Sequence, residues 1–305
     1  MTQGTKTIIQ VLGPTGVGKS IVSVELAKKI RGEIISADSM QVYQEFDIGT
    51  AKIGTAEKQN IPHYLIDIYH DCSQFNASIF LRESFAVSEA IIRRNGIPIV
   101  CGGTALYLKR MIEGIFPESS AKRVSREKLN RIAETRGLEY LWNRLNKIDP
   151  LYAQKVGKND KVRIVRAMEI YYNNGVPPSV IFAQTQTPFH DYHFIRIGLN
   201  MERGALYKRI EKRVDKMVEN GLREEVDRLR KKYPPDCPPF KSVGYKEMLM
   251  YLEGKIDFEK AVELIKQHTR NFAKRQLSWF RQEKDIHWFH PLEFSKIEAF
   301  IRERL

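Results

Sequence analysis

Short apolar runs alternate with segments of helical period in the first third of the chain. The runs at residues 7–12, 33–37 and 97–103 have the length and the aliphatic content of buried strands. Between them, residues 20–30 and 80–96 repeat their apolar positions at the spacing of amphipathic helices. This alternation is typical of βαβ units, so we expect an α/β fold with a parallel sheet.

The pattern changes near Pro117. Residues 119–174 lack strand-like runs and contain basic segments of helical period, and a strand-like run returns at residues 192–200. We therefore expect a parallel-sheet core that is interrupted by a helical insertion domain. The expected domains are 1–117 for the first part of the core, 118–190 for the insertion, and 191–305 for the second part of the core with basic C-terminal helices.

The sequence GPTGVGKS, residues Gly13–Ser20, joins the first expected strand to the first expected helix. Its G-x-x-x-x-G-K-[ST] spacing is typical of loops whose backbone N–H groups, with the N-terminus of the following helix, bind phosphates. Lys19 adds a positive charge, and Ser20 offers a hydroxyl to a phosphate-bound Mg²⁺. The loop predicts a diphosphate, and by itself it does not identify that ligand as a nucleotide.

An ATP-hydrolysing machine would also need a buried strand that ends in Asp, for a second contact to Mg²⁺. The run at 97–103 instead ends in Gly102-Gly103, and Asp67 lies inside an apolar run rather than at its end. The sequence therefore argues against a motor or a switch.

Asp38 directly follows the strand expected at residues 33–37, so it belongs to the same edge of the sheet as the phosphate loop. Ligands of open α/β sheets bind at that edge, where a carboxylate can accept a proton from a nucleophile brought to the phosphates. Alternatively, the Asp38 side chain caps the turn that follows the strand. Thr104, after the Gly102-Gly103 pair, brings a hydroxyl to the same edge.

The formal net charge of +13 is unevenly distributed. Residues 1–119 carry 12 basic and 12 acidic residues, whereas residues 120–175 carry 13 and six, and residues 203–284 carry 21 and 13. A basic excess confined to two blocks away from the phosphate loop favours a polyanionic partner. Solvated Lys-rich helices are the alternative explanation.

Residues 269–281, TRNFAKRQLSWFR, interleave basic and aromatic side chains in the second basic block. We interpret the rings of Phe272, Trp279 and Phe280 mainly as core, because they have helical spacing, and we assign the Lys and Arg residues to a partner. His287 is interpreted as a strand residue without a chemical role.

Cys72, Cys101 and Cys237 lie far apart and form no C-x-x-C pair, which argues against a zinc site and a disulfide framework. No segment approaches the length of a membrane span. We therefore expect a cytoplasmic protein without membrane association.

Together these residues resemble the tRNA dimethylallyltransferase (tRNA isopentenyltransferase) family in its bacterial form. The matching segments follow the family order over roughly residues 8–289. They are GPTGVGKS, ISADSMQVY, DIGTAK, IPHYLID, CGGTALYL, NDKVRIVRAMEI, KSVGYKE and TRNFAKRQLSWFR. Many members have His-His where this chain has His63-Tyr64.

The resemblance implies a P-loop α/β core with a helical insertion, and a prenyltransferase that needs Mg²⁺. Members transfer the dimethylallyl group of dimethylallyl diphosphate to the exocyclic N6 amine of an adenosine and release pyrophosphate. That adenosine is 3′-adjacent to the anticodon in tRNAs reading codons that begin with U. The implied partners are therefore dimethylallyl diphosphate and the anticodon arm of a tRNA, and we expect the chain to act as a monomer.

The resemblance also implies roles for individual residues. Asp38 would be the general base. The diphosphate would be bound by Gly13, Pro14, Thr15, Gly16, Val17, Gly18, Lys19, Ser20 and Arg209. The tRNA would be contacted by Asp38, Ser39, Met40, Gln41, Thr104, Arg126, Val162, Arg163, Ile164, Val165 and Arg166.

Three other functions share parts of this pattern. A small-molecule P-loop kinase has the loop and a strand-end Asp, but it does not explain the basic insertion. An adenylate isopentenyltransferase shares the core and has less need of a large basic surface. A non-catalytic RNA-binding protein regulated by a nucleotide would show no prenyl transfer at all.

Overall fold

The computed structural model describes residues 6–116 and 124–305. It divides into two compact units, the first made of residues 1–111 and 189–305 and the second of residues 112–188. The boundaries expected after residues 117 and 190 thus fall a few residues beyond those of the structure. Arg126, which we expect to contact the tRNA, belongs to the second unit and lies within its described residues.

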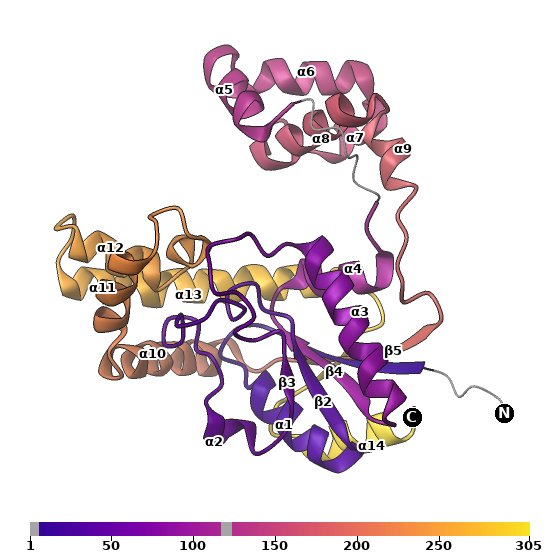
Figure 1. The fold of residues 1–305 in the computed structure, drawn as a ribbon, viewed down its shortest axis with the longest axis vertical. Coiled ribbons are helices and arrows are strands. Elements are labelled where there is room, and N and C mark those ends of the chain that lie inside the picture. The colour runs from indigo at the N-terminus through magenta and orange to yellow at the C-terminus, as the bar shows by residue number, and fades with distance from the viewer. Residues whose placement is uncertain (1–5, 117–123) are drawn as a thin grey trace. The chain divides into compact units, whose positions relative to one another are not determined.

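The first unit is built on a sheet of six parallel strands in the order β3-β2-β4-β1-β5-β6. Figure 1 labels four of them, β2, β3, β4 and β5. The strands are β1 (Lys6–Leu12), β2 (Gly32–Ser36), β3 (His63–Tyr64), β4 (Ile97–Gly102), β5 (Tyr192–Leu199) and β6 (His287–Phe289). The four strands expected from apolar runs are β1, β2, β4 and β5, so the α/β prediction is confirmed. The two-residue strand β3 is too short to leave a sequence pattern. His287 begins β6, as a strand residue.

The helices of the first unit connect these strands and extend beyond them. They are α1 (Lys19–Ile30), α2 (Thr55–Lys58), α3 (Ala77–Arg93), α4 (Ala105–Glu113, whose last two residues belong to the second unit), α10 (Arg203–Glu219), α11 (Leu222–Lys232), η1 (Pro238–Lys241), α12 (Tyr245–Leu252), α13 (Phe258–Phe280) and α14 (Phe294–Arg302). Figure 1 shows α13 as a long helix that runs beside α12. No helix in the described ranges is long and apolar enough to cross a membrane.

The core of the first unit joins the sheet to α1, α10 and α14. Ile9 and Val11 of β1 are fully buried with Ile99 of β4, and Ile197 of β5 and Ile210 of α10 belong to the same cluster. Strands that are buried on both faces read as continuous aliphatic runs, which is why their apolar pattern was detectable in the sequence.

The strand order creates a crevice at the carboxyl ends of β1 and β4. These strands are neighbours, yet the chain goes from β1 toward β2 on one side and from β4 toward β5 on the other. Such a switch point is where open α/β sheets bind ligands. The phosphate loop follows β1, and Gly102 ends β4 with Gly103 directly after it, so both segments border this crevice.

Cys72 and Cys237 form a disulfide in the structure. The argument from spacing against a disulfide framework therefore missed this bond. The two residues are 165 positions apart, and the fold brings the loop before α3 against the turn before η1. A spacing rule cannot detect such a pair, because the contact depends on the tertiary structure. Cys101 is free.

The second unit is helical in its described part. It contains α5 (Arg126–Arg136), α6 (Leu138–Ile148), α7 (Pro150–Lys155), α8 (Lys161–Asn174) and α9 (Pro178–Phe182). Its core includes Leu129, Leu145 and Met168, all fully buried. Capping residues place the helix starts: the side chain of Ser125 accepts the N–H of Lys128, and that of Asp160 accepts the N–H of Arg163.

Candidate active site

The phosphate loop connects β1 to α1 through backbone conformations that favour glycine. Gly13, Gly16 and Gly18 have φ angles of 146°, 80° and 105°. At Gly13 there is also no room for a side chain, because a Cβ atom would lie 2.5 Å from the carbonyl oxygen of Leu199. The sequence motif therefore has the structural context that a phosphate-binding loop requires.

Lys19 begins α1 and points back into the loop. Its Nζ donates hydrogen bonds to the carbonyl oxygens of Gly13 at 3.0 Å and Pro14 at 2.9 Å. Burial is the main cause that lowers the pKa of Lys19 to about 8, while the negative charge of Asp38 acts in the opposite direction. An anion that enters the loop would favour the charged form of this side chain.

Asp38 lies two residues beyond the end of β2, at the crevice. Its Oδ1 accepts the backbone N–H of Met40 at 2.8 Å, so the turn-capping interaction is present. The same residue lines a cavity of about 100 Å³ with Lys19, Ser20 and Gln41. Capping therefore orients the carboxylate and leaves it in the cavity that the phosphate loop borders, so the two interpretations of Asp38 are compatible.

Thr104 and Gln41 also lie at this edge. The backbone N–H of Thr104 donates to the carbonyl oxygen of Ala37 at 3.2 Å, directly beside Asp38. Gln41 accepts a hydrogen bond from Ser36 at 3.2 Å through its Oε1. The structure thus brings together Asp38, Gln41 and Thr104, which are distant in the sequence from the phosphate loop.

The mostly polar lining of the smaller cavity also contains apolar residues. They include Ile34, Ile53, Ile66 and the free Cys101. Burial raises the pKa of the Cys101 thiol. A short hydrocarbon group next to the phosphate loop would find here the apolar surface that a charged metabolite does not need.

A larger cavity of about 600 Å³ adjoins the smaller one and shares Lys19, Ser20 and Arg213 with it. Helix α10 supplies three cations to its lining, Arg209, Arg213 and Lys216. Arg209 lies close to the loop, since its Nη2 would be 3.4 Å from a Cβ atom at Gly18. The cavity therefore combines the open end of the phosphate loop with positive charge.

Sequence reasoning missed Arg213. Its Nη1 donates to Oγ1 of Thr15 in the phosphate loop at 3.2 Å. Burial lowers the pKa of this guanidinium, and the negative charge of Asp38 acts in the opposite direction. The helical spacing could have identified it: Arg213 is four residues after Arg209, so both side chains lie on the same face of the helix.

Gln276 of α13 was also missed. Its Oε1 accepts the backbone N–H of Thr15 at 2.8 Å, and its Nε2 donates to the carbonyl oxygen of Gly103 at 2.9 Å. The side chain is buried at the crevice. No local pattern marks this residue, because its partners lie in the first third of the chain.

The interpretation of the three rings in residues 269–281 as core holds only in part. Phe280 is buried and Trp279 is half-buried, whereas Phe272 is 40% exposed and lines the smaller cavity. Helical spacing identifies the face of a helix, but it does not show whether another element covers that face. Phe272 is therefore a ring at the candidate site rather than a core residue.

A Mg²⁺ ion would depend on the substrate for most of its ligands. In the described part of the chain, no group of three or more His, Cys, Asp or Glu side chains could hold a metal ion. Ser20 is exposed at the start of α1 and lines both cavities. A single hydroxyl beside substrate phosphates fits the coordination that Mg²⁺ prefers.

In the second unit, Arg126 and Arg166 share one carboxylate. Arg126 Nε and Arg166 Nη1 lie 2.7 Å and 2.6 Å from Oε2 of Glu169. Arg163 pairs with Asp160 at 3.0 Å and remains largely exposed. These three Arg side chains are cations on the unit's surface.

The remaining residues of the segment 162–166 differ in exposure. Val162 is 80% exposed, while Ile164 and Val165 are buried in the core of the second unit. Their side chains hold α8 in place and are not available to an RNA surface. The side chains of Val162, Arg163 and Arg166 are the accessible ones of this segment, and the tRNA contacts expected for residues 162–166 stay a prediction.

Tyr64 lies outside the lining of the smaller cavity, whereas His63 belongs to it. The hydroxyl of Tyr64 donates to Oε2 of Glu33 at 2.7 Å and accepts from Arg94 at 2.8 Å. Tyr64 therefore makes its hydrogen bonds at the edge strand β3, away from the smaller cavity. Burial lowers the pKa of His63, which favours its neutral form.

Comparison with known proteins identifies the family of this chain. A family model described as IPP transferase matches residues 41–283. The tRNA dimethylallyltransferase of Carboxydothermus hydrogenoformans is 44% identical over 286 residues, 93% of this chain and 92% of that protein. That of Halothermothrix orenii is 44% identical over 301 residues, 97% of this chain and 92% of that protein.

Solved structures agree as well. The full-length tRNA isopentenylpyrophosphate transferase of Bacillus halodurans is 37% identical with a TM-score of 0.74, over 98% of this chain and 96% of that one. A eukaryotic dimethylallyltransferase acting on tRNA is 32% identical with a TM-score of 0.82, over 98% of this chain and 77% of that one. With a family match over most of its length and relatives above 40% identity, this chain belongs to the IPP transferase family.

Proposed function

We propose that the chain transfers the dimethylallyl group of dimethylallyl diphosphate to the N6 amine of an adenosine in tRNA. The observation that carries this proposal is that one cavity is lined by Lys19 of the phosphate loop, by Asp38 and by several apolar residues. The named relatives act as tRNA dimethylallyltransferases, which favours prenyl transfer over the kinase alternative. We further propose that the adenosine is 3′-adjacent to the anticodon in tRNAs reading codons that begin with U.

The roles follow from the chemistry of each group. Loop N–H groups, Lys19 and Arg209 would bind the diphosphate and stabilise the charge that develops on it as the allylic C–O bond breaks. The N6 atom then forms a bond to the allylic carbon, pyrophosphate leaves, and Asp38 accepts the proton that N6 loses. Mg²⁺, held by the diphosphate and the Ser20 hydroxyl, would supply further positive charge to the leaving group.

The adenosine must leave the anticodon stack to reach Asp38. Phe272 offers an exposed ring at the cavity on which a base can stack, beside Gln41 and Asp38. Arg126, Val162, Arg163 and Arg166 would contact the tRNA through the second unit, with Thr104, Ser39 and Met40 near the reacting base. We propose a cytoplasmic, monomeric enzyme.

The test is to incubate the protein with tRNA, dimethylallyl diphosphate and Mg²⁺ and to analyse the nucleosides by mass spectrometry. We expect an adenosine that gains a dimethylallyl group only when all three are present. AMP prenylation without tRNA would instead favour an adenylate isopentenyltransferase. Consumption of γ-labelled ATP with a small acceptor would favour a kinase, and failure of every prenyl transfer would favour a non-catalytic RNA-binding protein.

A further inference from the structure

The loop at residues 47–53 forms a wall of both cavities of the candidate site. Its side chains at Ala51 and Ile53 line both of them. Thr50 lines the smaller cavity, while Asp47 and Lys52 line the larger one. The loop belongs to no helix or strand, so the shape of the site depends on contacts that fix the loop from outside.

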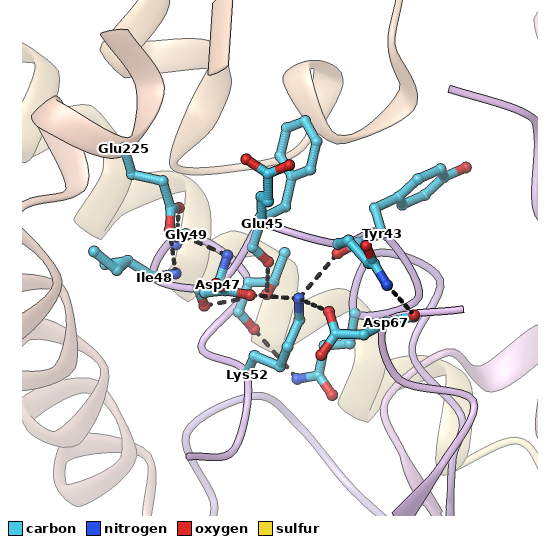
Figure 2. A network of polar contacts seen from close by, with 12 residues as sticks. Tyr43, Glu45, Asp47, Ile48, Gly49, Lys52, Asp67 and Glu225 are labelled. Carbon is cyan, nitrogen blue, oxygen red and sulfur yellow. Dashed lines mark hydrogen bonds and ion pairs between the residues drawn. The ribbon is translucent and has the colours of Figure 1, made fainter. Parts of the chain in front are cut away.

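A single buried carboxylate from another part of the chain fixes this loop. Oε2 of Glu225 accepts the backbone N–H groups of Asp47 at 3.1 Å and Ile48 at 2.8 Å, and Oε1 accepts that of Gly49 at 3.1 Å. Figure 2 shows the Glu225 carboxylate facing the backbone nitrogen atoms of Ile48 and Gly49. Glu225 lies on α11, more than 170 residues from the loop in sequence, and is only 6% exposed.

Tyr245 completes the arrangement. Its hydroxyl donates to Oε1 of Glu225 at 2.5 Å, and its side chain is fully buried. The ring also packs on the loop backbone, since a Cβ atom at Gly49 would lie 2.3 Å from it. Three backbone N–H groups and one hydroxyl thus satisfy a buried carboxylate that has no ion pair with a Lys or Arg among the described residues.

The opposite side of the loop is connected to the Asp38 segment. Nε2 of Gln41 donates to the carbonyl oxygens of Thr50 at 3.3 Å and Ala51 at 3.4 Å. Lys52 is also buried, and its Nζ contacts Asp47 and Asp67 at 2.5 Å each and the carbonyl oxygen of Tyr43 at 2.9 Å (Figure 2). A displacement of the loop at residues 47–49 would therefore move the wall of the cavities and the carbonyl partners of Gln41.

We propose that Glu225 is a positioning residue for the prenyl transfer, which acts by holding the backbone of residues 47–49 and with it the wall of the substrate cavities. This inference rests on the proposed function for its kinetic readout. Glu225 itself does not line either cavity, so its effect on the reaction is indirect. The Glu45 carboxylate also joins this loop region to α11, through ion pairs with Arg228 and Lys232, but these cations are exposed whereas the Glu225 contacts are buried.

Glu225→Gln removes the charge and turns an N–H₂ group toward the backbone donors, so at least one of the three hydrogen bonds is lost. The matched control is Glu224→Gln, because Glu224 is the preceding residue of the same helical turn, is exposed and pairs only with Arg223 among described residues. Tyr245→Phe is the milder variant, since it removes one hydroxyl and keeps the ring that packs on Gly49.

Two measurements test the proposal. Amide hydrogen exchange of the full chain should accelerate at residues 47–49 in Glu225→Gln by at least tenfold, and to a lesser degree in Tyr245→Phe. Steady-state kinetics should show at least a tenfold loss of kcat/KM for dimethylallyl diphosphate, with tRNA affinity within about twofold of the wild type. Glu224→Gln should match the wild type in both measurements.

Three results would overturn the proposal: unchanged exchange at residues 47–49, faster local exchange with wild-type kinetics, or acceleration spread over the whole chain. If Glu225→Gln does not fold, Tyr245→Phe decides by the same criteria. Binding of inorganic pyrophosphate, measured by calorimetry, separates this inference from the proposed function. If the wild-type protein prenylates no substrate, the proposed function is refuted. Weaker pyrophosphate binding by Glu225→Gln, together with faster exchange at residues 47–49, would still support the positioning role in that case.

Discussion

The backbone N–H of Thr15 donates a 2.8 Å hydrogen bond to Oε1 of Gln276, which lies 261 residues further along the chain. The other end of the same amide donates to the carbonyl oxygen of Gly103. One side chain of α13 therefore joins the loops after β1 and β4, the two strands that border the crevice. A helix of the second basic block is thus bonded directly to the phosphate loop.

We predict that Gln276→Leu weakens both folding and diphosphate binding. The substitution leaves the buried carbonyl of Gly103 without this donor, at about 1–3 kcal/mol, and removes the acceptor of the part-buried Thr15 N–H in the phosphate loop. Chemical denaturation and calorimetric titration with inorganic pyrophosphate would measure the two effects. Gln267→Leu, at an exposed position of the same helix, is the control and should change neither. Pyrophosphate affinity equal to that of the wild type would show that the amide does not shape the loop.

The Lys19 pKa of about 8 predicts a pH-dependent affinity for the diphosphate. Below that pH the ammonium is charged and attracts the anion. As the pH rises above 8, Lys19 in the free protein loses its proton, so binding must recover it and affinity should fall by up to about tenfold per pH unit. Titrations with pyrophosphate between pH 6.5 and 9 measure how the affinity changes with pH.

In the same titrations, Lys19→Arg should remove the break near pH 8, because a guanidinium stays charged throughout this range. Lys19→Ala should bind weakly at every pH. A wild-type affinity that stays flat across pH 8 would contradict the assigned role of Lys19.

Salt should weaken tRNA binding steeply. If the basic residues of 120–175 and 203–284 neutralise about six phosphates, the log–log slope of affinity against salt is near −5. Arg163→Ala should make that slope shallower by roughly 0.7–0.9, the contribution of one phosphate contact. Lys29→Ala, on α1, should leave it unchanged. A slope near zero would remove the electrostatic argument for RNA binding.

The Cys72–Cys237 bond should stabilise the oxidised protein. Bridges of this kind typically contribute about 2–4 kcal/mol to the free energy of unfolding. Urea denaturation with and without reductant measures the difference, and Cys72→Ser should abolish it. Alkylation of the unfolded, unreduced protein should label Cys101 alone. Labelling of all three cysteines would show that the bond does not form.

Features set by neighbouring residues were predictable from the sequence, and features set by distant contacts were not. The strands β1 and β4 and the loop at Gly13–Ser20 follow from local patterns. Glu225 and Gln276 bond to backbone groups more than 170 residues away, so only the folded chain gives them a role. The exposure of Phe272 was misjudged for the same reason, since its helical spacing does not show what covers it.

Asp38 is the residue whose substitution tests the chemistry most directly. Asp38→Ala should lower turnover by about 10²–10⁴, or roughly 3–5 kcal/mol of barrier, because it removes the proposed base. It also removes the acceptor of the Met40 N–H, so a loss of about 1 kcal/mol in folding free energy should accompany it. Pyrophosphate binding should persist in the folded protein.

Asp38→Asn separates the two effects. The Asn side chain can still accept the Met40 N–H and keep the orientation of the turn, but it is not a base. If proton removal from N6 is what Asp38 supplies, Asp38→Asn should be nearly as inactive as Asp38→Ala while regaining the lost stability. If orientation dominates, the Asn variant should recover much of the activity.

Single-turnover rates with saturating tRNA and dimethylallyl diphosphate make the comparison. A wild-type rate for Asp38→Ala, where chemistry limits, would leave Asp38 with capping as its only role, and the base would then have to lie elsewhere along the crevice between β1 and β4.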